Sequence, residues 1–139
     1  MFLLDTHVWI WFSSDDGTRL GRRAKQAVAQ AQREDGLRIS PASLFEVASL
    51  HTHGRLRFSL PPERWVADAL TVPGLRIAAL TADIAVDAGL IPRTALADPI
   101  DRLLVATARQ LDAILVTADR RILDYAGNTH HLRAQDAGR

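Results

Sequence analysis

The sequence of 139 residues predicts an α/β fold, an α/β/α sandwich around a parallel sheet of about four or five strands. Short apolar runs alternate along the chain with longer segments whose apolar residues recur at helical spacing. The apolar runs lack the polar alternation of a half-exposed strand, as expected for parallel strands that are buried on both faces. No repeat and no long linker divides the chain, so residues 1–139 are predicted to form a single domain.

The strands are predicted from short apolar runs that end at a polar residue or a turn. The clearest run, at 113–117, carries no charge, and the run at 2–4 is followed at once by an acid. In chain order, the predicted strands cover residues 2–4, 37–40, 75–80, 113–117 and, more weakly, 131–133. His130 and His131, with the tail to Arg139, are otherwise expected to form a loose terminus.

The helices are predicted from apolar spacing and from residues that begin helices. In the first, Leu20, Ala24, Val28 and Ala31 share one face. Ser40 precedes a later helix as its cap, followed by a proline at the first helical position. The predicted helices cover about 19–34, 41–53, a segment after Pro62, 82–90 after the cap Thr81, 99–111 and 120–125.

The composition excludes several classes of protein. The chain has no Cys, which rules out a thiolate nucleophile, a Cys-based zinc site, an iron–sulfur cluster and disulfides. It has neither a basic leader nor an apolar run of about 18 residues, so we expect a soluble cytoplasmic protein without a membrane partner. Its 17 basic and 16 acidic residues nearly balance, and 13 of the acids are Asp, which favours caps, turns and metal sites.

Carboxylates from four separate segments are predicted to meet at one edge of the sheet. Asp5 ends the first strand, and Asp119 follows the most apolar strand. Glu46 lies in the helix after the second strand, and Asp98 and Asp101 share a face at the head of a later helix. Sites in parallel sheets lie outside the carboxyl ends of the strands, so these five acids are the candidate catalytic residues.

Helix capping is an alternative role for three of these acids. Asp98 and Asp119 each precede a predicted helix, and Asp101 would lie near the positive end of a helix dipole. Glu46 alone is compatible with an ordinary solvated glutamate. Asp5 is harder to dismiss as an ordinary residue, because a charge at the end of a central strand is costly unless it has a partner.

Taken together, the acids favour a metal site. Carboxylates within a few Å repel one another, and a divalent cation such as Mg²⁺ or Mn²⁺ relieves this repulsion. The single Lys, Lys25, lies in a predicted surface helix, and Arg102 is the nearest basic residue in sequence. Metal-assisted phosphodiester hydrolysis suits such a site, with one ion activating water and another stabilising the leaving oxygen. The hydroxyls of Thr6, Ser43 and Thr117 are expected to orient carboxylates or ligand water.

Four segments around these acids match the blocks of a known family in order. They are FLLDTHVWIWF with Asp5, SPASLFEVA with Glu46, DPIDRLLVATA with Asp98 and Asp101, and ILVTADRRI with Asp119. Together they span nearly the whole chain. They resemble the PIN-domain ribonucleases and, within them, the VapC-type toxins of bacterial toxin–antitoxin pairs.

The resemblance implies a single PIN-like nuclease domain over residues 1–139 and a Mg²⁺-dependent endoribonuclease toxin that hydrolyses RNA. It also implies a cognate VapB-type antitoxin and a homodimer. The implied metal ligands are Asp5, Glu46, Asp101 and Asp119. Asp101 is preferred to Asp98 because it directly precedes the Arg-Leu-Leu-Val-Ala run. Leu96 and Ala97 stand where relatives often have a His and a basic residue, which changes the expected substrate contacts there.

Three other functions fit part of the pattern. A catalytically silent RNA- or protein-binding module with the same fold would retain RNA in Mn²⁺ without cleaving it. A phosphoacceptor receiver domain also gathers Asp residues at strand ends, but it needs a Lys after a late strand, where this sequence has none. A phosphatase of the haloacid dehalogenase type needs an Asp at the position that His7 occupies.

Two further features bear on partners. Trp9 and Trp11 would point about 200° apart on a helix, so they cannot both enter one core, and an exposed aromatic would suit an antitoxin groove or a dimer contact. Without the five candidate acids, 17 basic residues face 11 acidic ones, a net charge of +6. We therefore expect an Arg-rich exterior around an acidic site.

Overall fold

The computed structural model describes residues 1–14 and 17–139, and within them five parallel strands form one sheet. The strands are β1 Phe2–Leu4, β2 Leu37–Ile39, β3 Leu75–Ile77, β4 Ile114–Thr117 and β5 Arg133–Asp136. Their order across the sheet is β3-β2-β1-β4-β5. The predicted parallel sheet is confirmed, with β3 ending three residues early and β5 beginning two residues late.

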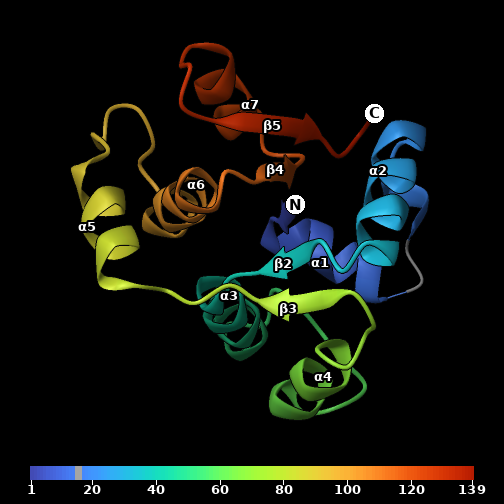
Figure 1. Ribbon diagram of the computed structural model, residues 1–139. Helices are drawn as coiled ribbons and strands as arrows, with labels where there is room; N and C mark the ends of the chain where they lie inside the picture. Colours follow the sequence, from blue (N-terminus) through green and yellow to red (C-terminus); the bar gives the residue numbers. More distant parts are fainter. Residues whose placement is uncertain (15–16) are drawn as a thin grey trace.

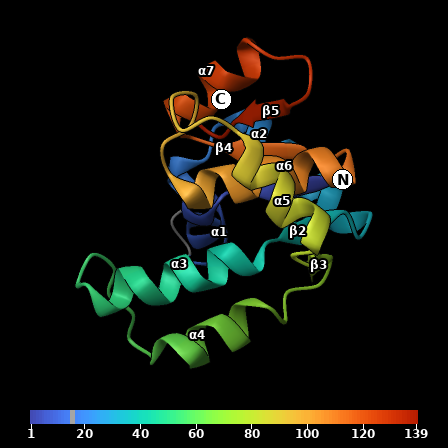
Figure 2. The same cartoon turned by 90° about the vertical axis from the view of Figure 1, so that its left-hand side faces the viewer.

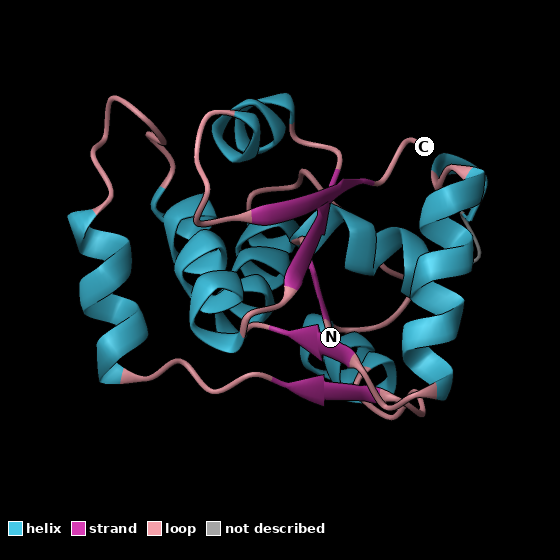
Figure 3. Ribbon diagram, turned by 45° about the horizontal axis from the view of Figure 1, so that its top comes forward, coloured by secondary structure: helices cyan, strands magenta, loops and turns pink. Residues whose placement is uncertain are grey.

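Helices cover both faces of the sheet, which confirms the α/β/α sandwich (Figures 1 and 3). Leu4 of β1 packs with Trp9 and Val28 on one face, whereas Leu3 packs with Leu104 on the other. The helices are α1 Thr6–Ser13, α2 Arg22–Arg33, α3 Pro41–Thr52, α4 Pro62–Ala69, α5 Ala82–Leu90, α6 Pro99–Leu111 and α7 Arg120–Gly127, with a 3₁₀ turn at Gly17–Arg19. Figure 2 shows α3 and α4 side by side, and α5 against α6.

The centre of the sheet is its topological switch point. The chain runs outward from β1 through β2 to β3, then returns to place β4 on the other side of β1. Leu4 pairs in register with Val116, so β1 and β4 end at the same edge. In open parallel sheets this is where ligands bind.

The helix α1 is not among the predicted elements. Val8, Trp9 and Ile10 are all buried, so no polar face marks this segment as a helix in the sequence. The helix packs between β4 and α3, and it forms because these contacts bury it on several sides. As expected, the two tryptophans differ in burial, because Trp9 is fully enclosed while Trp11 lies half-buried at the edge of the core.

The C-terminal tail is held against α2, which corrects the prediction of a loose terminus. The Gly21 N–H donates to the Ala137 carbonyl at 2.8 Å, and the Arg23 N–H donates to the Arg139 carbonyl at 2.7 Å. A Cβ at residue 21 would collide with the backbone of Arg139, so only glycine permits this approach. The helix α2 begins at Arg22, three residues later than predicted.

The predicted helix caps are confirmed. The Ser40 hydroxyl accepts from the Ala42 N–H at 3.0 Å, and the Thr81 hydroxyl accepts from the Ile84 N–H at 3.2 Å. Each bond satisfies a backbone donor that the helix itself leaves unpaired. Among the helices of the described residues, none has the length and apolar character needed to cross a membrane.

Candidate active site

All five predicted catalytic acids line one cavity of about 420 Å³ at the switch point. They reach it from the ends of β1 and β4, from α3 and from the head of α6. The acids are Asp5, Glu46, Asp98, Asp101 and Asp119, and His7, Trp11, Leu50, Arg55, Ala118 and Arg121 complete the lining. Residues far apart in sequence meet here because parallel strands share one carboxyl edge.

Asp5 is held by hydrogen bonds to both of its carboxylate oxygens. It is 7% exposed, and it caps α1 by accepting from the Thr6 N–H at 2.7 Å. The Thr117 hydroxyl donates to its other oxygen at 2.6 Å and accepts from the Asp119 N–H at 3.0 Å. Burial raises the pKa of Asp5, and the two hydrogen bonds oppose this rise.

Glu46 lies inside α3, whose position is tied to α1. The buried Thr6 hydroxyl donates to the buried Ser43 hydroxyl at 2.9 Å, which joins the two helices beneath the cavity. Burial raises the pKa of Glu46, and the charges of Asp5 and Asp98 add to this effect. Thr6 and Ser43 therefore fix the helix that presents Glu46.

Burial and the charges of all four other acids of the cavity act together on Asp101. It is the third residue of α6, is 9% exposed, and makes no hydrogen bond or ion pair with the other described residues. Burial raises its pKa to about 7, helped by the charges of Asp98, Asp5, Asp119 and Glu46, in decreasing order. This carboxyl thus lies in the combined negative field of the other four acids.

Capping and cavity lining coexist at Asp98 and Asp119. Asp98 caps α6 by accepting from the Ile100 N–H at 2.8 Å, and Asp119 caps α7 by accepting from the Arg121 N–H at 2.8 Å. The second oxygen of Asp119 lies 3.4 Å from the Arg121 guanidinium. Each of these acids can therefore cap a helix and line the cavity, because a cap bond occupies only one carboxylate oxygen.

The donor set of the cavity fits a hard divalent cation. Within residues 1–14 and 17–139, no three Asp, Glu or His side chains form a ready-made metal-binding group. Mg²⁺ does not need one, because it usually keeps several waters and binds through one or two carboxylates. Burial is the main cause of the raised pKa of Asp101, and a cation there would relieve the repulsion from the other acids that adds to it.

The cationic residues of the cavity were not predicted from the sequence. Arg102, the nearest basic residue along the chain, instead lines a separate small cavity with Pro99 and Leu103. Arg55 and Arg121 line the acidic cavity. The sequence does hold a signal for Arg55, since Gly54 follows a predicted helix and marks its end.

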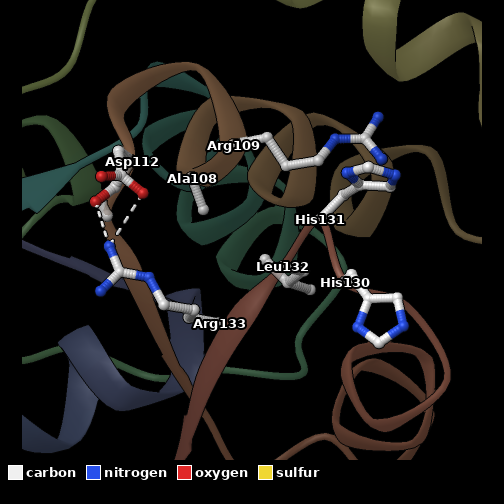
Figure 4. Close-up of a pocket in the computed structure, with 8 residues that line it drawn as sticks. Ala108, Arg109, Asp112, His130, His131, Leu132 and Arg133 are labelled. Carbon is white, nitrogen blue, oxygen red and sulfur yellow. Dashed lines mark hydrogen bonds and ion pairs between the residues drawn. The ribbon is translucent and has the colours of Figure 1, made fainter.

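A second cavity, of about 200 Å³, lies at the amino ends of β4 and β5, away from the acids (Figure 4). Arg109 and Arg133 line it together with His130 and His131. Arg109 pairs with Asp87 at 2.8 Å, and Arg133 pairs with Asp112 at 3.0 Å. Since both guanidinium groups are already neutralised, we place the functional site at the acidic cavity.

Comparisons with known proteins identify the family of the chain. The family model described as the PIN domain matches residues 2–128. Ribonuclease VapC22 of Mycobacterium tuberculosis is 35% identical over 120 residues, which cover 86% of this chain and 88% of that protein.

Solved structures share the fold at lower identity. VapBC2 from Rickettsia felis, bound to a DNA fragment from its promoter, has a TM-score of 0.68 at 16% identity and covers 97% of both chains. DNA-bound VapBC from Salmonella typhimurium has a TM-score of 0.65 at 21% identity, over 97% of this chain and 96% of that one. The match to residues 2–128 and the extended identity show that this chain belongs to the PIN-domain family, as a VapC-type member.

Proposed function

We propose that this chain is an endoribonuclease toxin that hydrolyses RNA phosphodiester bonds at the acidic cavity and depends on Mg²⁺ or Mn²⁺. The convergence of five carboxylates at the switch point is the observation that carries this proposal. The ribonuclease activity named for VapC22 supports it. A silent RNA-binding module is the alternative, and it is less favoured because the set of acids is complete.

Asp5, Glu46, Asp101 and Asp119 would hold the cation. When bound there, it supplies the positive charge that activates water and stabilises the leaving oxygen. The chain itself supplies orientation, because Thr6 and Thr117 fix both oxygens of Asp5. The exposed Arg121 is anchored by Asp119 at the cavity wall, where its remaining N–H groups can bind a substrate phosphate.

We also propose a VapB-type antitoxin as inhibitor and a homodimer as the toxin's assembly. Structural neighbours of the chain include VapBC complexes, which supports the antitoxin. Large apolar side chains on the surface suit protein partners: Phe45 on α3 is 65% exposed, and Val86 and Leu90 on α5 are 63% and 75% exposed.

A circular RNA tests the proposed activity, because only an endonuclease can open it. In Mg²⁺, the purified chain should convert the circle to a linear product and then to fragments. Asp5→Asn, which keeps the shape of the side chain but removes its charge, should leave the circle intact. Binding of the circle without cleavage in both Mg²⁺ and Mn²⁺ would favour the silent module, and full activity of Asp5→Asn would exclude the proposed site.

Thr117→Val should lower the cleavage rate about 10- to 100-fold, the usual effect of losing a group that orients a metal ligand. The variant loses the donor to Asp5 and the acceptor for the Asp119 N–H. Thr117→Ser, which restores the hydroxyl, should recover most of the rate. Steady-state kinetics with melting curves checks this, and an unchanged rate in the folded Val variant would contradict the role of Thr117.

A further inference from the structure

We propose that Arg55 and the pocket beside it, at the C-terminal end of α3, form a subsite for a backbone phosphate of the RNA strand that enters the acidic cavity. This inference rests on the proposed function, since RNA is the ligand. It concerns residues that none of the four matching sequence segments contains.

The position of Arg55 is fixed by the way in which α3 ends. Gly54 has a φ of +71°, and its N–H donates to the His51 carbonyl at 3.0 Å. The Arg55 N–H donates back to the Leu50 carbonyl at 2.9 Å. These two bonds and the left-handed glycine form a Schellman motif, so the backbone of Arg55 is tied to the helix rather than free in the loop.

Arg55 lines a further pocket as well as the acidic cavity. This pocket, of about 270 Å³, is lined by Ser49, Leu50, His53 and Arg55, and the acidic cavity shares Leu50 and Arg55 with it. Glu46, Ser49, Leu50 and His53 are spaced at three, four and seven residues, so they share one face of α3. One helix face therefore leads from the acids to the subsite.

Charge supports a phosphate as the occupant. Arg121, the other arginine of the cavity, is paired with Asp119. Arg55 is exposed, and its guanidinium makes no ion pair or hydrogen bond with any residue in the described part of the chain. A guanidinium matches the geometry of a phosphate and binds it through two parallel hydrogen bonds.

The length of α3 indicates how far Arg55 lies from the acids that would hold the cation. Thr52, the last residue of α3, lies six positions after Glu46, a distance of roughly 9 Å along the helix axis at about 1.5 Å per residue. Arg55, which lies three residues beyond Thr52, would therefore contact a backbone phosphate other than the scissile one.

Arg55→Ala tests the subsite. With a long single-stranded RNA, KM should rise about tenfold while kcat stays unchanged, because the lost contact is remote from the reacting bond. In the non-cleaving Asp101→Asn background, the affinity should fall equally and the slope of log affinity against log salt should decrease by about one phosphate contact. Arg55→Lys should recover part of the affinity.

Two controls isolate the contact. Arg57→Ala removes an exposed arginine two residues away that lines neither pocket, and it should bind RNA as the wild type does. A dinucleotide substrate, too short to reach Arg55, should be cleaved equally by the wild type and Arg55→Ala. If Arg55→Ala keeps the affinity and salt slope of Arg57→Ala, the subsite is wrong while RNA cleavage stands. If the wild type neither binds nor cleaves RNA, the proposed function fails and the subsite fails with it.

Discussion

Asp101→Asn should lower kcat/KM for RNA by about 10³-fold or more and should also raise the melting temperature at pH 8. The catalytic loss follows from removing a charged ligand, since metal-derived charge stabilisation is worth several kcal/mol and each 1.36 kcal/mol is about tenfold in rate. The gain in stability follows from removing a carboxylate that burial and four neighbouring acids hold at a pKa of about 7. We therefore expect this one substitution to lower the activity and to raise the stability.

The pH dependence of this stability change has a definite sign. The pKa of Asp101 is about 7 in the folded chain and close to 3.8 when unfolded. Between these values the folded state binds more protons, so the free energy of unfolding of the wild type falls as pH rises. The Asp101→Asn variant lacks this titration, and its advantage in melting temperature should grow from pH 4 to pH 7 and then level off.

Asp124→Asn is a matched control for Asp101→Asn, because Asp124 is exposed on α7 and does not line the cavity. It should change neither the cleavage rate nor the melting temperature. Melting curves between pH 4 and pH 8, together with single-turnover cleavage, test both results. An Asp101→Asn variant that cleaves at the wild-type rate, or that gains no stability at pH 8, would contradict the role given to this carboxyl.

Removing divalent cations should bring RNA cleavage down to background, and adding Mg²⁺ should stabilise the fold. A cation that binds only the folded state raises the melting temperature, by several degrees when its concentration is about 100 times Kd. The shift should be larger at pH 8 than at pH 6, because below a pKa of about 7 a proton on Asp101 competes with the cation.

Two comparisons make the cation experiment specific. Added NaCl at equal ionic strength should not reproduce the shift, because screening acts weakly on partly buried charges. Asp101→Asn should show a smaller shift with Mg²⁺, since one carboxylate is missing. Full cleavage in excess chelator would rule out the dependence on a divalent cation while leaving the fold and family intact.

The acids of the candidate site could be predicted because local features of the sequence mark their positions. Asp5 and Asp119 directly follow apolar runs, and Asp98 precedes a proline at the start of a helix. Such signals fix where strands end and helices begin, and parallel strands bring those ends to one edge. The structure places all five acids at one cavity for this reason. Their roles as metal ligands stay predictions until the variants are measured.

Other parts of the site depend on contacts between distant segments. Arg102 is the basic residue nearest to the acids in sequence, yet Arg55 and Arg121 reach the cavity, because the ends of α3 and α7 decide which side chains face it.

The sequence by itself determined the alternation of strands and helices, their caps and the edge where the carboxylates meet, because each depends on neighbouring residues. Tertiary structure alone decided α1, which is buried on several sides and shows no helical periodicity. It also decided the docking of the tail on Gly21 and the placement of Arg55 in the lining of the acidic cavity. Packing and backbone contacts between segments far apart in the chain leave no pattern in a local stretch of sequence.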